Sequence, residues 1–188
     1  NAAGATPTFA KLTGLAGNVN ASIRDIAIDP SNPNILVAGL VAAATTGGIY
    51  RTADALAANP TFTQTFQFTS GTTTSELTTE FAAVHPAGNT DATCYAATGN
   101  RGGRVLRSTD GGASWIQQID NNFCTPQCFY DVAVAVDPTN ADRVYLGGAP
   151  AVIAAFSTTA GTAFTEGGSG VHVDTQVLTV APSNPTIV

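Results

Sequence analysis

The sequence is poor in charged residues, and this scarcity limits what the protein is expected to bind. Only 11% of the 188 residues are Asp, Glu, Lys or Arg, whereas about 25% is usual for a soluble domain. Seven basic residues stand against 13 acidic ones, which gives a net charge of −6. Nucleic acid and anionic membrane surfaces are therefore unfavourable partners, because both attract proteins with an excess of Lys and Arg.

Long apolar runs and methionine are missing as well. No stretch approaches the roughly 18 consecutive apolar residues of a membrane-spanning helix, so we expect no membrane insertion. The nearest candidate for an amphipathic helix, SELTTEFAAV, ends in residues that the repeats described below assign to a strand. Because the chain contains no Met, Asn1 is not a translation start, and we expect a signal sequence or a larger region before it.

A turn motif recurs along the chain at a nearly constant interval. Its complete form, RSTDGGASW, contains Ser108, Asp110, Gly112 and Trp115. The Asp offers an acceptor to nearby backbone amides, and the glycines tolerate a positive φ. Incomplete copies contain Thr52, Asp54 and Phe62, and Ser157, Gly161 and Phe164, and Phe9 ends what resembles a further copy. The closing aromatic residues lie about 50 residues apart, which is typical of an array of supersecondary units.

A second element repeats in phase with the first. An apolar strand leads into a polar turn with a proline, and another apolar strand follows; the prolines are Pro30, Pro86, Pro138 and Pro182. Each unit is thus predicted to hold four short antiparallel strands, as one blade of a β-propeller does. We predict one all-β propeller domain over 1–188, with three full blades and partial ones at both ends. The predicted units are 1–20, 21–70, 71–122, 123–170 and 171–188.

Propellers close their rings with about 4 to 8 blades. Three full units are fewer than that, so the remaining blades are expected to come from the same chain or from another one. The chain is then interpreted as a fragment of a larger propeller.

The complete turn motif resembles the Asp-box, or BNR repeat, which has the pattern S-x-D-x-G-x-x-W. Asp-boxes occur in sialidases, sortilin-type receptors, xyloglucan-active glycosidases and photosystem assembly factors. The pairing of VAVDPTNADRVYLGG with GGRVLRSTDGGASW is most similar to the xyloglucanase and sortilin branch. The resemblance covers essentially the whole chain as repeats. It implies that the box residues, Asp110 among them, stabilise hairpins on the face away from any active site.

The cysteines bear on the cellular compartment. Cys124 and Cys128 stand at the two ends of a short loop that contains a proline, where a disulfide or a metal is conceivable. The further ligands of a metal site are missing, because His85 and His172 belong to other units. We therefore predict a disulfide, no metal and no cofactor, and an extracellular or periplasmic protein. Cys94 lies in an apolar strand and is predicted to be a buried free thiol.

Function is expected on the face opposite the boxes. Each predicted unit has an acidic residue where its first strand begins, near the central channel, at Asp25, Glu80, Asp131 and Asp174. Paired carboxylates on one face are what glycoside hydrolysis requires. Alternatively, these residues cap loops or bind water in the channel, and we favour this interpretation.

Two further groups are candidates for binding. Arg101 and Arg104, on the Gly-rich loop GNRGGR, could clamp a carboxylate or a sugar acid. A sialidase needs three convergent arginines, and its Arg-Ile-Pro type of motif is absent. His172 and Asp174 resemble an H-x-D-x-H segment of some Asp-box proteins, but Gln176 replaces the last His, so no metal site is predicted. Tyr130 is one of the few aromatic residues in the loops of this face.

Three functions are compatible with these features. The first, which we favour, is a secreted, non-catalytic propeller that serves as a binding or structural module with a carbohydrate or peptide ligand. The second is part of a glycoside hydrolase, either xyloglucanase-like or sialidase-like. The third is a receptor-like or assembly-factor propeller that binds a peptide in its channel. The small loops rich in Thr, Gly and Ala favour the first function.

Overall fold

The computed structural model describes residues 15, 22–41, 46–68, 78–149, 152, 154–181, 183–184 and 188. Phe9, Pro182 and nearly all of the predicted first unit, 1–20, lie outside these residues. The described strands form three four-stranded antiparallel sheets, each in simple chain order. The prediction of an all-β chain built from four-stranded antiparallel units is confirmed.

The three sheets follow one another along the chain. The first contains β1 (Ser22–Asp29), β2 (Asn32–Val41), β3 (Gly48–Thr52) and β4 (Thr63–Gln67). The second contains β5 (Thr79–Val84), β6 (Thr93–Thr98), β7 (Arg104–Ser108) and β8 (Ile116–Asp120). The third contains β9 (Ala133–Asp137), β10 (Asn140–Gly147), β11 (Ala155–Ser157) and β12 (Thr165–Glu166). The described residues include a short 3-10 turn, η4 (Asn100–Gly102), and among them no helix is long and apolar enough to cross a membrane.

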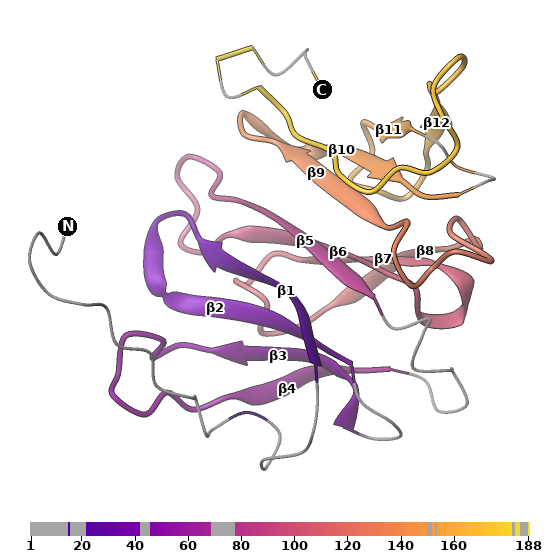
Figure 1. Ribbon diagram of the computed structural model, residues 1–188. Coiled ribbons are helices and arrows are strands. Elements are labelled where there is room, and N and C mark those ends of the chain that lie inside the picture. The colour runs from indigo at the N-terminus through magenta and orange to yellow at the C-terminus, as the bar shows by residue number, and fades with distance from the viewer. Residues whose placement is uncertain are drawn as a thin grey trace, which may run out of the picture.

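The first strands of the sheets lie side by side, with β5 between β1 and β9 (Figure 1). The first and second sheets share a core that contains Val37, Ile49 and Leu106. The second and third share a larger one, in which Tyr95 and Leu146 are fully buried. Adjacent blades of a propeller pack in this way, with their first strands at the inside.

The strands differ in burial according to their neighbours. β6 and β9 are buried at every position. By contrast, β1 exposes Ile23, Ile26 and Ile28, since no described residue covers that face of the strand.

Residues 171–181 run along the third sheet without forming a strand. Leu178–Val180 line one pocket together with Val134–Val136 of β9, and Thr175 N–H donates to the carbonyl of Gly148 at 3.3 Å. The sequence suggests the first strand of another unit here. A β-strand requires a hydrogen-bonded neighbouring strand, and the described residues provide none for this segment.

The antiparallel order gives the sheets two distinct ends. The connections from β1 to β2, β3 to β4, β5 to β6, β7 to β8, β9 to β10 and β11 to β12 form one end, which we call the turn end. The connections from β2 to β3, β4 to β5, β6 to β7, β8 to β9 and β10 to β11 form the other, which we call the loop end. The turn motifs that fall within the described residues lie at the turn end.

Candidate ligand-binding site

The complete turn motif satisfies its own polar groups between β7 and β8. Ser108 Oγ donates to Asp110 Oδ1 at 2.7 Å and accepts from Gly112 N–H at 2.8 Å. Asp110 also accepts from the backbone N–H of Ser114 at 2.9 Å and from the Ser114 hydroxyl. Gly112 has a φ of 84°, and a Cβ there would lie 2.3 Å from Val37 Cγ1 of the first sheet. The polar groups of the turn therefore bond one another, and the turn packs against the first sheet.

The two incomplete copies occupy the equivalent turns and keep part of this bonding. Between β3 and β4, the Thr52 hydroxyl donates to Asp54, which also accepts from Thr61 N–H at 2.9 Å. Between β11 and β12, Ser157 Oγ accepts from Gly161 N–H at 3.0 Å. The additional residues in the first copy are thus accommodated without loss of the Asp54 contacts.

The aromatic residues that close the motifs are half-buried: Phe62, Trp115 and Phe164. Trp115 joins the first two sheets, because its Nε1 donates to Thr65 Oγ1 at 3.1 Å. Its ring centroid lies 6.2 Å from that of Phe81 on β5. Phe164 packs against the core shared by the second and third sheets. These contacts place the aromatic residues in the packing of the blades.

Carboxylates of the turn end are stabilised in their charged form. The pKa lies below its ordinary value at Asp29, Asp54, Asp110 and Asp137. At Asp110, burial raises the pKa, but hydrogen bonds from Ser114 and Ser108 outweigh it. At Asp54, the hydroxyl of Thr52 is the largest cause of the lowered pKa. Each of these groups is bonded to residues of its own hairpin, and Asp29 also contacts His85 Nδ1 of the second sheet at 3.3 Å, as structural carboxylates do.

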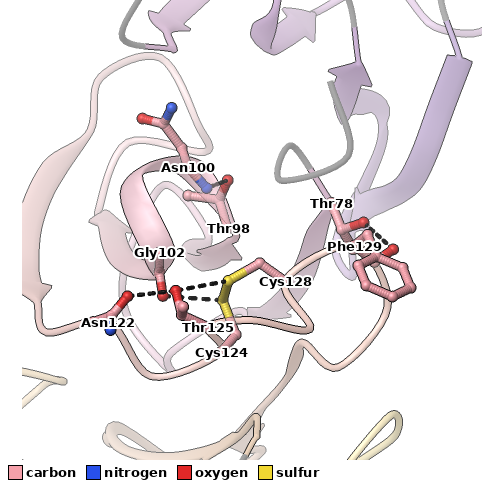
Figure 2. Close-up of a disulfide and its surroundings, with 9 residues drawn as sticks. All are labelled: Thr78, Thr98, Asn100, Gly102, Asn122, Cys124, Thr125, Cys128 and Phe129. Atoms are coloured by element: carbon pink, nitrogen blue, oxygen red, sulfur yellow. Dashed lines mark hydrogen bonds between the residues drawn. A yellow bond between two sulfur atoms is a disulfide. The ribbon is translucent and has the colours of Figure 1, made fainter. Parts of the chain in front are cut away.

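The loop end is built around residues 121–132, which connect β8 to β9. Cys124 and Cys128 form a disulfide there, with their Cα atoms 4.7 Å apart (Figure 2), so the predicted pairing is confirmed. Cys94 is free and buried, as predicted, and burial raises the pKa of its thiol to about 12. A buried thiol of this kind is unreactive.

Contacts with the second sheet hold this loop in place. Phe123 is fully buried in the core, and Cys124 N–H donates to the carbonyl of Gly102 at 3.2 Å. The Thr78 hydroxyl, just before β5, donates to the carbonyl of Phe129 at 2.7 Å (Figure 2). The end of the loop is thereby fixed beside the start of β5.

The side-chain amide of Gln127 links two of the predicted acidic residues. With its nitrogen facing them, Gln127 donates to Asp131 Oδ2 and to Asp174 Oδ1, each at 3.1 Å, and its oxygen accepts from the Tyr130 hydroxyl at 2.8 Å. This orientation gives all three neighbours a matching partner. Asp131 precedes β9 and Asp174 belongs to the C-terminal segment, so the two carboxylates meet where this segment crosses the third sheet.

Asp131 is the most buried of the four predicted acidic residues. None of its surface is exposed, and its Oδ1 has no hydrogen-bond partner among the residues that the structure describes. Burial raises the pKa of Asp131, and the nearby charge of Asp174 raises it further. Perturbed, buried carboxyl groups of this kind gather at functional sites.

Two aromatic side chains lie open to solvent beside this carboxylate pair. Phe129 is 45% exposed and Tyr130 is 37% exposed, with ring centroids 4.5 Å apart. His172 is largely exposed, and its Nδ1 lies 3.6 Å from Asp174 Oδ2. We call this group the aspartate–aromatic site; it consists of Gln127, Phe129, Tyr130, Asp131, His172 and Asp174.

The other two predicted acidic residues form a separate pair. Asp25 Oδ2 accepts from the backbone N–H of Phe81 at 2.8 Å and so joins β1 to β5. Half-burial and the charge of Asp25 raise the pKa of Glu80 to about 7. The row of four carboxylates expected at the channel is thus two pairs, each across one junction.

The predicted arginine pair has a partner within the protein. Arg101 Nε and Arg104 Nε lie 3.7 Å and 3.3 Å from the same carboxylate oxygen of Asp120, at the end of β8. Arg104 is buried, and Arg101 adopts a φ of 59° in the turn η4. The carboxylate that this pair clamps is therefore that of Asp120.

Sequence reasoning missed two of the residues that organise this end, Gln127 and Asp120. Gln127 lies in CTPQC, between the two cysteines, and that position was the only signal in the sequence. No group of three or more metal-ligating side chains occurs in the described part of the chain.

Comparisons with known proteins bear on the fold. No protein-family model matches the chain, and no curated protein matches its sequence. A GH74 enzyme from Niastella koreensis superposes with a TM-score of 0.56 at 22% identity, over 84% of this chain and 22% of that one. YCF48 from Cyanidioschyzon merolae superposes with a TM-score of 0.50 at 13% identity, over 79% of this chain and 37% of that one. Both neighbours are β-propellers. The chain has a propeller-type fold.

The likeness covers only part of each neighbour. This chain spans about a fifth of the Niastella enzyme and somewhat more than a third of YCF48. At these identities the likeness extends to the fold and not to the chemistry of either protein.

Proposed function

We propose that this chain is a ligand-binding module of a β-propeller, and that it binds through the aspartate–aromatic site. The observation that carries the proposal is the exposed pair Phe129 and Tyr130, joined through Gln127 to two carboxylates. Exposed aromatic faces beside a few convergent polar groups are typical of binding sites. The disulfide at the base of the same loop keeps these groups in position.

The geometry of the carboxylate pair favours binding over hydrolysis. Asp131 and Asp174 each have an oxygen 3.1 Å from the same nitrogen, so these oxygens are separated by no more than twice that distance. An inverting glycosidase holds its carboxyl groups about 6.5–9.5 Å apart to admit a water. A retaining one needs its nucleophile to reach the sugar, and Asp131 has no exposed surface.

We further propose that the chain is an Asp-box propeller protein and that it is secreted. The bonding of Ser108, Asp110 and Gly112 supports the first statement, because it gives each conserved position of the Asp-box pattern a structural task. The disulfide supports the second, since such bonds persist in oxidising compartments. The remaining blades of the propeller are proposed as its structural partners.

A glycoside hydrolase is the second candidate, and one observation favours it. Glu80, whose pKa is raised to about 7, lies beside Asp25, and a carboxyl group with a raised pKa is the usual general acid of such enzymes. We expect the chain alone to hydrolyse neither β-glucan, xyloglucan nor sialosides. Turnover that is abolished by Glu80→Gln or Asp131→Asn would establish the hydrolase in place of the binding module.

Binding is tested with defined probes. The 188-residue chain is titrated with a xyloglucan oligosaccharide, a cello-oligosaccharide and short peptides, and affinity is measured by ligand-observed NMR. We expect at least one probe to bind and the double variant Phe129→Ala, Tyr130→Ala to lose it. Phe156→Ala is the matched control, because Phe156 is equally exposed, at 42%, on β11. Absence of binding at millimolar probe, or equal loss in the control, would contradict the proposal.

A further inference from the structure

The carboxylates of the aspartate–aromatic site have no cationic partner among the described basic residues. Five arginines contact groups elsewhere; these are Arg51 at the Gly111 carbonyl, Arg101 and Arg104 at Asp120, Arg107 at Asp142 and Arg143 at Asp137. The sixth, Arg24, is exposed on β1 in the first sheet, with the second sheet between it and β9. The described arginines thus lie away from Asp131 and Asp174.

His172 does not fill this place in the arrangement observed. Its Nδ1 accepts a hydrogen bond from the backbone N–H of Asp174 at 3.3 Å. The imidazole is 80% exposed, so it is free to turn away from an incoming group.

The hydrogen bonding of the pair is incomplete. The amide of Gln127 is a neutral donor shared between both carboxylates. Asp131 Oδ1 is buried and, within the described residues, has no partner. A buried carboxylate oxygen without a donor is uncommon in proteins and calls for one. The Gln176 side chain, which also hydrogen-bonds Asp131, is neutral as well, so these donors leave the negative charge of the two adjacent carboxyl groups uncompensated.

Aromatic faces beside negative charge favour one class of ligand. The rings of Phe129 and Tyr130 are exposed next to the carboxylates, with the Tyr130 hydroxyl bonded to Gln127. Ring faces attract cations, and organic cations more readily shed water onto such surfaces than metal ions do. No group of three metal-ligating side chains lies in the described residues, so the site suits an organic cation better than a metal.

We propose that the aspartate–aromatic site takes an ammonium or guanidinium group, such as the end of a Lys or Arg side chain in a bound peptide. This inference rests on the binding function proposed above and names its ligand class. The cation bonds the carboxylate of Asp174, which is partly exposed, and lies against the rings of Phe129 and Tyr130. Asp131 acts from beneath as a positioning residue, through its charge and through Gln127.

The test compares two peptides that differ in one charge. The first is an acetylated and amidated Gly-Gly-Lys-Gly-Gly, and the second is the same peptide with the lysine amine acetylated. We expect the first to bind and the second to bind about two- to fivefold more weakly, the loss that one partly exposed ion pair produces. Added salt should weaken binding of the first peptide only.

Two variants test whether binding of the lysine peptide depends on Asp174. Asp174→Asn should weaken binding of the lysine peptide about two- to fivefold. Asp142→Asn, which removes the same charge from an exposed position paired with Arg107, should leave its binding unchanged. Thermal unfolding checks that both variants are folded, and Asp174 lies in a segment without a strand, so folding is expected to survive.

Each outcome decides the inference. Equal binding of the two peptides, or equal loss in both variants, would overturn it. If a neutral oligosaccharide binds and depends on Phe129 and Tyr130 while the lysine peptide does not bind, the binding function stands and the cationic ligand is wrong. If no probe binds at millimolar concentration, both proposals fail.

Discussion

The turn end and the loop end use carboxylates in opposite ways. At the turn end, Asp110 accepts hydrogen bonds from within its own turn, and its pKa is lowered. At the loop end, the pKa values of Glu80 and Asp131 are raised by burial and by a neighbouring carboxylate. The aromatic residues of the turn motifs are half-buried, whereas Phe129 and Tyr130 at the loop end are exposed. The difference indicates that the turn end stabilises the blades, while the loop end is left available for a ligand.

Asp110 and Gln127 also differ in how far their side-chain hydrogen bonds reach along the chain. The bonds of Asp110 join residues two to four positions apart. The bonds of Gln127 reach Asp174, which belongs to a different segment. Local bonding gives a turn that forms with its own hairpin, whereas the loop-end cluster exists only once the sheets have packed.

Gly112→Ala should cause the largest loss of stability at the turn end. The new Cβ would meet Val37 Cγ1 of the first sheet at 2.3 Å, and Val37 is buried and cannot move aside. The residue would also hold a φ of 84°, which costs a non-glycine residue about 1–2 kcal/mol. With overpacking added, we expect a loss of about 3 kcal/mol in unfolding free energy. Denaturant unfolding measures it.

Gly88→Ala is the matched control for this change. Gly88 has nearly the same φ, 85°, but nothing lies within 4 Å of the position of its Cβ. The Gly88→Ala variant should therefore lose only about 1 kcal/mol of unfolding free energy, the cost of the backbone conformation. Equal losses in the two variants would show that the packing of the turn against the first sheet contributes nothing.

Asp→Asn substitutions at the two ends should have different effects at pH 7. Asp110→Asn replaces one acceptor oxygen with a donor that faces the donors of Ser114 and Ser108, so we expect a loss of about 1.5 kcal/mol. Asp131→Asn removes a buried charge beside Asp174 and should leave stability unchanged or raise it. Thermal unfolding of both variants tests this. A larger loss at Asp131 than at Asp110 would reverse the assignment of the ends.

Glu80→Gln should produce a small effect, and one that depends on pH. The pKa of Glu80 is about 7 in the folded chain against an ordinary 4.5, so the folded state binds the proton more tightly. Stability from this group is therefore complete below pH 4.5 and falls as the pH rises to about 7. The Gln variant should lack this decline and be more stable at pH 8 by on the order of 1 kcal/mol. Parallel stability curves for the two proteins from pH 5 to 8 would contradict the raised pKa.

The features that the sequence predicts well are those with local causes. The spacing of Ser108, Asp110 and Gly112 specifies a turn whose bonds lie within a few residues, and the alternating motifs indicate four strands for each unit. The disulfide follows from two cysteines in one short loop. Each of these depends on neighbours in the chain, so the pattern of residues is sufficient to predict them.

The loop end depends on partners that the pattern does not specify. The sequence indicates an acidic residue at the start of each unit, but not that Asp131 and Asp174 share the amide of Gln127. It indicates Arg101 and Arg104 as a clamp, but not that Asp120 lies between them. The first arrangement joins segments that become neighbours only when the C-terminal segment packs on the third sheet, whereas Arg104 and Asp120 are cross-strand partners on β7 and β8.

The central claim is that ligand binding is confined to the loop end, and amide chemical-shift mapping tests it most directly. The isotope-labelled chain is titrated with the lysine peptide, and shifts are followed at both ends. The account predicts shifts at residues 127–131 and 172–176 and none at residues 108–115, where Asp110 and its partners are bonded within the turn. Shifts centred on residues 108–115, with residues 127–131 unaffected, would contradict it.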